Sequence, residues 1–370
     1  MGVGKNHPFF SVIVPCCEVA PYVRECFASL TAQPFANWEC LAVVETSKDD
    51  TERVVREVAE TDPRFTVVVE GRSGSPATPR NTGLGLARGE YVVFLDGDDW
   101  LERDALGTLA QKIAEQPGAD LYPCAVTELV ESESGERTFK AVVDCYPEDS
   151  PKRLGGREAI RYLDGYPDRA NPMSVLTVCR RAFLDRWNLR FVPGLVHEDE
   201  EFAPRALYRA ASVVPLHYAY YVYRMRAGSI MAGQSTVNVR FEHIARVLAS
   251  LFRFHAEVKS EPDFDRAFSP IWTRNWFSKV FFFFFAKKYV RSVPRRRRLS
   301  ALREILFADG FGDFDFALAL CSRPKRVAGA FVRFGVRTGL LWLADVFFVW
   351  FYFPLCYRRA ERRMTTSSEV

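Results

Sequence analysis

The strongest constraint on the fold of this chain is an alternation of short strand-like and helix-like segments over its first hundred residues. Short apolar runs rich in β-branched residues predict strands, and segments with apolar residues at helical spacing separate them. The predicted strands are Phe9–Pro15, Trp38–Glu45, Phe65–Glu70 and Tyr91–Leu95. The predicted helices begin at Pro21, at Thr51 and at Thr78, which would be an N-cap before Pro79. This alternation predicts an α/β domain with a mostly parallel, doubly wound sheet.

The alternation weakens after Leu121. Short strands are predicted at 122–130, 138–143, 173–181 and 213–224, and a loop enters a helix at about Asp199. From Val237 onward the pattern becomes helical. We therefore expect two domains, residues 1–232 and 233–370.

Three aspartates, Asp96, Asp98 and Asp99, directly follow the apolar run that ends at Leu95. Ligands of parallel sheets bind beyond the carboxyl ends of the strands, where these aspartates are expected. Several like charges at one place resist joint ionisation unless a cation compensates them. Oxygen ligands on a short turn suit Mg²⁺ or Mn²⁺. The alternative is that these residues cap a helix starting near Glu102.

Further acidic residues lie at two distant places in the sequence. Glu45 ends the second predicted strand within VVETSKDDT, and Glu198 and Asp199 belong to the run HEDEEF. The stretch from Thr78 to Leu101, TPRNTGLGLARGEYVVFLDGDDWL, reads continuously as a helix, a strand and an acidic turn.

Together these segments resemble the family 2 glycosyltransferases, a large group of inverting enzymes with the GT-A fold. The resemblance covers about Phe9 to Ile230 and includes YRMRAGSI at the end of that stretch. It implies a nucleotide-diphosphate sugar donor and assigns a role to each matching position. The implied donor-binding residues are Pro15 and Glu45 near the base or ribose, Arg80 and Asn81 on the nucleotide side, Asp96 near the ribose, and Asp98. The other implied roles are metal binding by Asp98 with help from Asp99, general-base catalysis by Asp199 with Glu198 beside it, and contact of Arg224 and Arg226 with the diphosphate or the acceptor.

The chemistry of sugar transfer requires the same kinds of residue. Expulsion of a diphosphate needs a divalent ion and a basic group, because negative charge grows on the leaving group. The incoming hydroxyl is a weak nucleophile and needs a carboxylate within hydrogen-bond reach. Attack opposite the leaving group would invert the anomeric centre.

Each assigned residue also has an ordinary structural interpretation. Acidic residues such as Asp199 stabilise helix N-termini through the helix dipole. Arg224 and Arg226 would pair equally well with surface carboxylates. Asn81 would be an exposed helix residue, and His197 a structural one.

The sequence departs from the family pattern on the base-and-ribose side. Cys16–Cys17 follows the first strand where the family has an aromatic–Asn pair, and VVETSKDD lacks the usual Asp-Gly-Ser. These departures concern the identity of the nucleotide and the role of Glu45. The metal and base positions match.

The C-terminal part is basic and rich in aromatic residues. From Gly233 onward it holds 24 Lys or Arg and 12 Asp or Glu, a formal charge of +12 against −8 for the remainder. The run Leu340–Tyr357 is almost wholly apolar with arginines on both sides, which favours an interfacial or re-entrant helix at a membrane over a full span. A buried core or dimer helix is the alternative. Arg295–Arg298 lacks an accompanying nucleic-acid fold, so anionic lipid headgroups fit this run better than nucleic acid.

The sequence indicates no signal peptide, and its nine cysteines show no metal spacing, so reduced thiols and a cytoplasmic location are expected. Our main hypothesis is a metal-dependent inverting glycosyltransferase at the cytoplasmic side of the plasma (inner) membrane, acting on a lipid-linked saccharide in surface polysaccharide synthesis. A non-catalytic GT-A-like binding module is the second hypothesis. A nucleotidyltransferase is the third, although PCCEVAPY lacks the Gly-rich loop of that class. Assembly into a homo-oligomer remains open.

Overall fold

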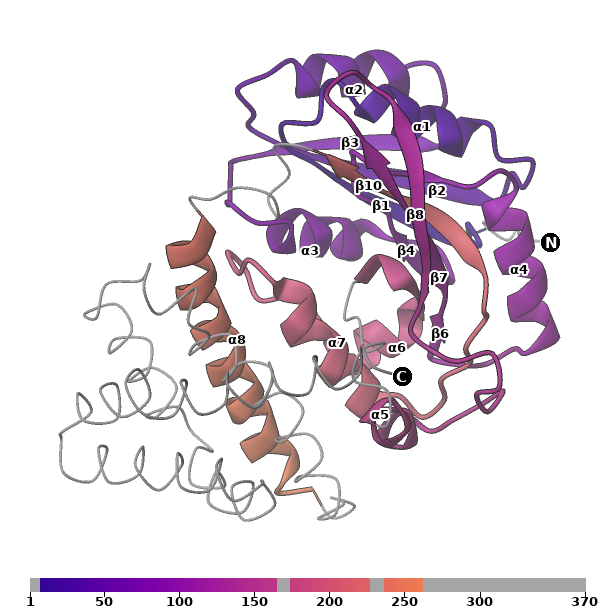
Figure 1. Cartoon of the computed structure of the whole chain (residues 1–370), viewed down its shortest axis with the longest axis vertical. Coiled ribbons are helices and arrows are strands. Elements are labelled where there is room, and N and C mark those ends of the chain that lie inside the picture. The colour runs from indigo at the N-terminus through magenta and orange to yellow at the C-terminus, as the bar shows by residue number, and fades with distance from the viewer. Residues whose placement is uncertain (1–6, 165–173, 227–235, 262–370) are drawn as a thin grey trace, which may run out of the picture. The chain divides into compact units, whose positions relative to one another are not determined.

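The computed structural model describes residues 7–164, 174–226 and 236–261. The chain divides into two compact units, Met1–Gly233 and Gln234–Val370 (Figure 1). The division falls one residue after the predicted boundary between residues 232 and 233. All of the predicted site residues belong to the first unit.

A six-stranded sheet organises the first unit, with strand order β3-β2-β1-β4-β9-β6. Its first four strands in the chain are parallel: β1 (Phe10–Cys16), β2 (Trp38–Glu45), β3 (Phe65–Glu70) and β4 (Tyr91–Phe94). Helices α1 (Val23–Thr31) and α2 (Thr51–Ala59) cover one face, and α3 (Ala77–Leu86) covers the other (Figure 1). This confirms the α/β class and the four N-terminal strands.

The central strands β1, β2 and β4 are buried along their whole length. Their continuous apolar runs are typical of parallel strands with helices on both faces. Helix α3 lies close against the sheet, since a Cβ built on Gly83 would be 2.4 Å from a methyl group of Ile13. The predicted N-cap at Thr78 is wrong: α3 begins at Ala77 with Pro76 at the N-cap, so Pro79 lies within the first turn.

The prediction of a mostly parallel sheet is incomplete, because β9 (Thr177–Arg180) pairs antiparallel with both β4 and β6 (Leu121–Pro123). A second, mixed sheet has the order β5-β10-β7-β8. Its strands are β5 (Trp100–Leu101), β7 (Ala125–Glu131), β8 (Arg137–Asp144) and β10 (Ala219–Arg226). Apart from the parallel pair β7–β10, the neighbours of these strands are antiparallel and need no crossover helix. The local alternation that identified the first four strands therefore does not extend to them.

The remaining helices that the structure describes in the first unit are α4 (Ala105–Glu115), α5 (Gly156–Asp164), α6 (Arg181–Arg186) and α7 (Glu198–Arg209), with a 3₁₀ turn at Ser174–Leu176. The strand predicted at 173–181 is therefore shorter, and the one predicted from Val213 begins at Ala219. In the second unit the structure describes α8 (Thr236–Val258). The segments Phe281–Phe285, Arg295–Arg298 and Leu340–Tyr357 lie outside the described residues. Among the helices that are described, none combines the length and apolarity needed to cross a bilayer.

Candidate active site

The segment Asp96–Asp99, here called the acidic turn, lies at the carboxyl end of β4. The Asp99 N–H donates to the Asp96 carbonyl at 3.0 Å, which closes the turn. Gly97 packs against the end of β1, where an added Cβ would be 3.1 Å from the Pro15 carbonyl oxygen. Strand β5 follows directly and α4 begins at Ala105. The turn therefore does not cap a helix, and the helix-cap alternative is wrong.

Asp99 anchors the acidic turn to β10. Its carboxylate accepts a hydrogen bond from the Tyr221 hydroxyl at 2.5 Å and from the Arg224 N–H at 2.7 Å, and the residue is 1% exposed. Burial, followed by the charges of Asp98 and Asp96, raises the pKa of Asp99 well above its usual value. Both oxygens are thus engaged by protein donors. The metal-binding role of Asp99 stays a prediction.

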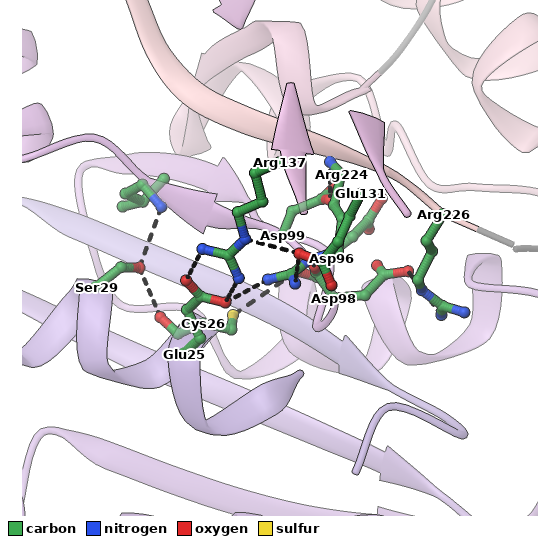
Figure 2. A network of polar contacts seen from close by, with 11 residues as sticks. Glu25, Cys26, Ser29, Asp96, Asp98, Asp99, Glu131, Arg137, Arg224 and Arg226 are labelled. Atoms are coloured by element: carbon green, nitrogen blue, oxygen red, sulfur yellow. Dashed lines mark hydrogen bonds and ion pairs between the residues drawn. The ribbon is translucent and has the colours of Figure 1, made fainter. Parts of the chain in front are cut away.

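Arg224, which also belongs to β10, contacts the acidic turn through its side chain. Its side chain is 2% exposed, and Nε donates to the Asp98 carbonyl at 2.7 Å. Its two terminal nitrogens lie 2.6 Å from Glu131 and 2.5 Å from Glu25, and Arg137 pairs with the same two glutamates (Figure 2). All three nitrogens of Arg224 are therefore directed at protein groups. Its predicted contact with a diphosphate or an acceptor stays untested.

Asp98 is more open than Asp99, with a side chain that is 23% exposed. Arg226 holds its Oδ2 through Nη2 at 2.9 Å and Nε at 3.2 Å, and the guanidinium lies 4.3 Å from the ring centre of Tyr22. Burial and the neighbouring Asp96 raise the pKa of Asp98, and Arg226 lowers it. Asp98 thus pairs with the guanidinium of Arg226. A divalent ion bound to Asp98 would compete with this guanidinium.

Arg80 joins the acidic turn to the distant acidic run at the start of α7. Its Nη2 lies 2.7 Å from Asp96, and its Nη1 lies 2.5 Å from Glu198 and 3.5 Å from Asp199. The Arg80 side chain is 2% exposed, whereas those of Asp96 and Asp199 are 29% and 22% exposed. The structure therefore brings together these four sequence-predicted residues.

The cluster around Arg80 contains more negative than positive charge. Burial would lower the pKa of Arg80, but the carboxylates of Asp96, Asp199 and Glu198 outweigh this effect and raise it. Burial, together with the charge of Asp199, raises the pKa of Glu198 to about 7, and burial also raises the pKa of Asp199. The cluster therefore holds a proton more readily than free carboxylates do. Asp199 is its accessible carboxylate on the α7 side.

The residues predicted to line the nucleotide have structural partners of their own. Pro15 is buried in β1, and Glu45 accepts a hydrogen bond from the Ser73 N–H at 2.7 Å. The Asn81 amide exchanges two hydrogen bonds, of 2.8 and 2.9 Å, with the backbone of Phe191. Glu45 and Asn81 thus fix loops beside the site. Their contact with a nucleotide stays a prediction.

Several residues of this site were not identified from the sequence. Tyr221 contacts both Asp99 and the Asp96 N–H, while Glu25, Glu131 and Arg137 surround Arg224 (Figure 2). The adjacent tyrosines in AYYVYR were the single sequence signal for Tyr221. The glutamates carry no motif, since they are ordinary residues of α1 and β7.

The carboxylates of the acidic turn are candidate ligands for a divalent ion. In the part of the chain that the structure describes, no three His, Cys, Asp or Glu side chains form a ready metal cluster. Asp98 and Asp96 nevertheless provide hard oxygen ligands that affect each other electrostatically. Mg²⁺ and Mn²⁺ are bound through one or two carboxylates when water and substrate phosphates complete the shell. Burial raises the pKa of the nearby Cys16, so this thiol stays protonated. The residues present fit a hard ion held jointly with a substrate.

Comparisons with known proteins agree with these observations. Residues 11–176 match the family model described as glycosyl transferase family 2. The chain is 30% identical over 230 residues to glycosyltransferase GlyA of Streptococcus pneumoniae, covering 60% of this chain and 31% of GlyA. It is 30% identical over 227 residues to the putative glycosyltransferase EpsH of Bacillus subtilis, covering 60% of this chain and 63% of EpsH. The chain thus spans less than two thirds of the length of these relatives.

A solved structure shares the fold. The structure of S. aureus TarS 1–349 in complex with UDP-GlcNAc matches with a TM-score of 0.69 and 21% sequence identity, over 95% of this chain and 92% of that one. A related structure of the same protein contains UDP and has a TM-score of 0.65.

Proposed function

Since the chain belongs to the family 2 glycosyl transferases and has a GT-A-like fold, we propose that it transfers a sugar from a nucleoside-diphosphate donor to an acceptor hydroxyl with inversion. The observation that carries this proposal is the buried Arg80, which joins Asp96 to Glu198 and Asp199. A transferase needs one acidic group on the donor side and one on the acceptor side, held at a fixed separation.

A UDP-sugar is the donor we propose to test first. The support is the UDP-GlcNAc complex of the structurally similar TarS. In this chain, Asp96 and Asp98 would face the donor from the carboxyl end of β4. When bound, Mn²⁺ or Mg²⁺ would be held through Asp98 and would neutralise charge on the diphosphate.

Asp199 is the residue we assign as the general base. It is partly exposed, its pKa is raised, and it lies at the start of α7 beside Arg80. Its carboxylate would accept the proton of the acceptor hydroxyl while the oxygen bonds to the anomeric carbon and the bond to the diphosphate breaks. Glu198 is 5% exposed and close to Arg80, so it positions the guanidinium instead of contacting the acceptor.

The acceptor we propose is a lipid-linked saccharide at the cytoplasmic face of the membrane, as in surface polysaccharide assembly. The support is the sequence of the C-terminal part, with its basic excess and the apolar run Leu340–Tyr357 between arginines. A peripheral or monotopic association is expected from that composition. A homo-oligomer stays an open part of this proposal.

The test is release of UDP from a panel of UDP-sugars, with and without a lipid-linked acceptor and with Mn²⁺ or EDTA. We expect acceptor-dependent release that EDTA abolishes and that Asp98→Asn reduces at least about 100-fold. Glu52→Gln removes a surface carboxylate of α2 and is the matched control. An Asp98→Asn enzyme with wild-type turnover, or no turnover with any donor, would overturn the proposal.

The second candidate function is a binding module without catalysis. It is favoured by the departures at Cys16–Cys17 and by the occupied side chains of Glu45 and Asn81 on the nucleotide side. Calorimetry with UDP and Mn²⁺ distinguishes the two candidates when it is combined with the turnover assay. Metal-dependent binding without turnover would favour the module.

A further inference from the structure

Two adjacent tyrosines, Tyr220 and Tyr221, lie at a β-bulge near the start of β10. Ala219 pairs with Ala125 of β7, and Tyr221 pairs with the next residue of β7, so Tyr220 is the extra residue of the bulge. Both tyrosines are fully buried. Neighbouring side chains of a regular strand point to opposite faces, whereas these two rings meet edge to face with their centres 6.0 Å apart. The bulge therefore places the two side chains next to each other.

The Tyr221 hydroxyl links the first and the last residue of the acidic turn. It donates a hydrogen bond to the Asp99 carboxylate at 2.5 Å and accepts one from the Asp96 N–H at 3.2 Å. The side chain of one aspartate and the backbone of the other are thus held by a single atom of β10. Asp98 lies between these two residues in the chain, so the hydroxyl also limits the positions that Asp98 can take.

The Tyr220 hydroxyl makes a corresponding contact on the side of the proposed base. It donates a hydrogen bond to the Val175 carbonyl oxygen, within the buried 3₁₀ turn Ser174–Leu176. This turn contacts α7, whose second residue is Asp199. Burial raises the pKa of Asp199, and hydrogen bonding by Ser174 is among the effects that lower it. The Tyr220 hydroxyl therefore supports the segment that lies against the carboxyl group of Asp199.

From these contacts we infer that Tyr220 and Tyr221 are positioning residues, which together fix the separation between the donor-side carboxylates and the general base. Arg80 joins the side chains of Asp96 and Asp199, whereas the tyrosines hold the backbone segments beside them. The two rings are in close-packed surroundings, so neither hydroxyl moves independently of the other. A displacement of about 1 Å between reacting groups can lower a rate about 100-fold. The inference rests on the proposed function.

The test compares three variants of the full chain, Tyr220→Phe, Tyr221→Phe and Tyr122→Phe, because each removes one buried hydroxyl and keeps the ring. Tyr122 is the matched control. It lies in β6, and its hydroxyl accepts a hydrogen bond from the Ala119 N–H and donates one to the Gln116 carbonyl oxygen, both at 3.0 Å. All three variants should lower the free energy of unfolding in urea, since each loses a buried hydrogen bond. The steady-state kinetic parameters should change in the first two alone.

The two tyrosines should affect different kinetic parameters. Tyr221→Phe should raise the KM for the UDP-sugar about tenfold, and should weaken UDP binding by the same factor in calorimetry with Mn²⁺, because it releases the donor-side turn. Tyr220→Phe should lower kcat about tenfold and leave the KM for the UDP-sugar within about twofold, because it releases the segment beside the base. Tyr122→Phe should leave kcat and KM within about twofold of the wild type.

Amide hydrogen exchange tests the Tyr221 contact without any turnover. The Asp96 N–H donates to the Tyr221 hydroxyl, so Tyr221→Phe should accelerate exchange of the Asp96 amide at least about tenfold. Tyr220→Phe and Tyr122→Phe should leave this rate unchanged. The same rate in Tyr221→Phe and in the wild type would mean that the hydroxyl does not hold the turn, and would overturn the inference on the donor side.

The kinetic results separate failure of the inference from failure of the proposed function. If kcat and KM change no more in Tyr220→Phe and Tyr221→Phe than in Tyr122→Phe, the inference is overturned and the proposed function stands. No turnover by the wild type would overturn the proposed function together with the role of Tyr220, and the exchange measurement would still decide whether Tyr221 holds the turn. Each variant is evaluated separately, so a result from one is decisive if the other does not fold.

Discussion

Arg80 and Arg224 contact different ends of the acidic turn, Asp96 and Asp98–Asp99 respectively, and are equally buried, with side chains 2% exposed. Arg224 meets a backbone carbonyl and two glutamates, so all three of its nitrogens have partners. Arg80 faces three carboxylates, and its Nε has no partner among the described groups. The same residue type thus completes a neutral framework on one side and leaves an unbalanced cluster on the other.

This difference indicates that the two ends of the acidic turn have different roles. On the Arg224 side, a saturated hydrogen-bond network fixes the geometry of Asp98 and Asp99. On the Arg80 side, burial raises the pKa values of two crowded carboxylates, Asp199 and Glu198, and that of Glu198 rises to about 7. Under the proposed function, a buried charge network would serve to fix position in one place and to provide reactivity in the other.

The largest expected effect tests the reactive side. Asp199→Asn should reduce turnover about 10²- to 10⁴-fold, which is the usual contribution of a general base, with little loss of stability because one of several like charges is removed. Turnover is measured as UDP release, and stability as the free energy of unfolding in urea. Glu52→Gln on α2 is the control. A variant with a much lower free energy of unfolding but full specific activity would mean that the two sides have the opposite roles.

The second prediction tests the structural side. Arg224→Met should lower the free energy of unfolding by about 3 to 4 kcal/mol, because Glu25 and Glu131 lose a buried partner. Arg56→Met, on the surface of α2, should change it by less than about 1 kcal/mol. The comparison is read from urea unfolding curves at pH 7. A small effect at Arg224 would show that Arg137 alone compensates for the two glutamates.

The two sides also differ in how far the sequence predicted them. Strands β1 to β4 were predictable because each is a local apolar run between helical segments. Arg80, Asp96 and Asp199 were identified through the resemblance to a family, since their positions belong to recurring motifs. The partners of Arg224 were not identified, because both are distant in the sequence: Glu131 meets it through the pairing of β10 with β7, and Glu25 comes from α1. Long-range strand pairing leaves no periodic signal in a single sequence.

The third prediction concerns the pH dependence of the reactive side. Burial and Asp199 raise the pKa of Glu198 from 4.5 to about 7. Between these values the folded state keeps a proton that the unfolded state has lost, so the free energy of unfolding falls as the pH rises through this window. Glu198→Gln should remove about 2 kcal/mol of that decline, measured by urea unfolding from pH 4.5 to 7.5. Glu57→Gln, on the surface of α2, should leave the slope unchanged. If the free energy of unfolding had the same pH slope in Glu198→Gln and in the wild type, the proton would be bound by another group.

The smallest expected effect is that of a substitution at Arg226, which lies on β10 and pairs with Asp98. Arg226 pairs with Asp98 through two hydrogen bonds, and its side chain is 15% exposed. A divalent ion bound to Asp98 would have to displace this guanidinium, at a cost typical of a partly exposed ion pair, below about 1 kcal/mol. Arg226→Ala should therefore increase the affinity for Mn²⁺ about threefold, measured by calorimetry in the presence of UDP. Arg24→Ala, which removes a surface ion pair with Glu57, is the control. A weaker affinity in Arg226→Ala would instead mean that Arg226 helps to hold the diphosphate beside the ion, which would extend the reactive side of the turn to β10.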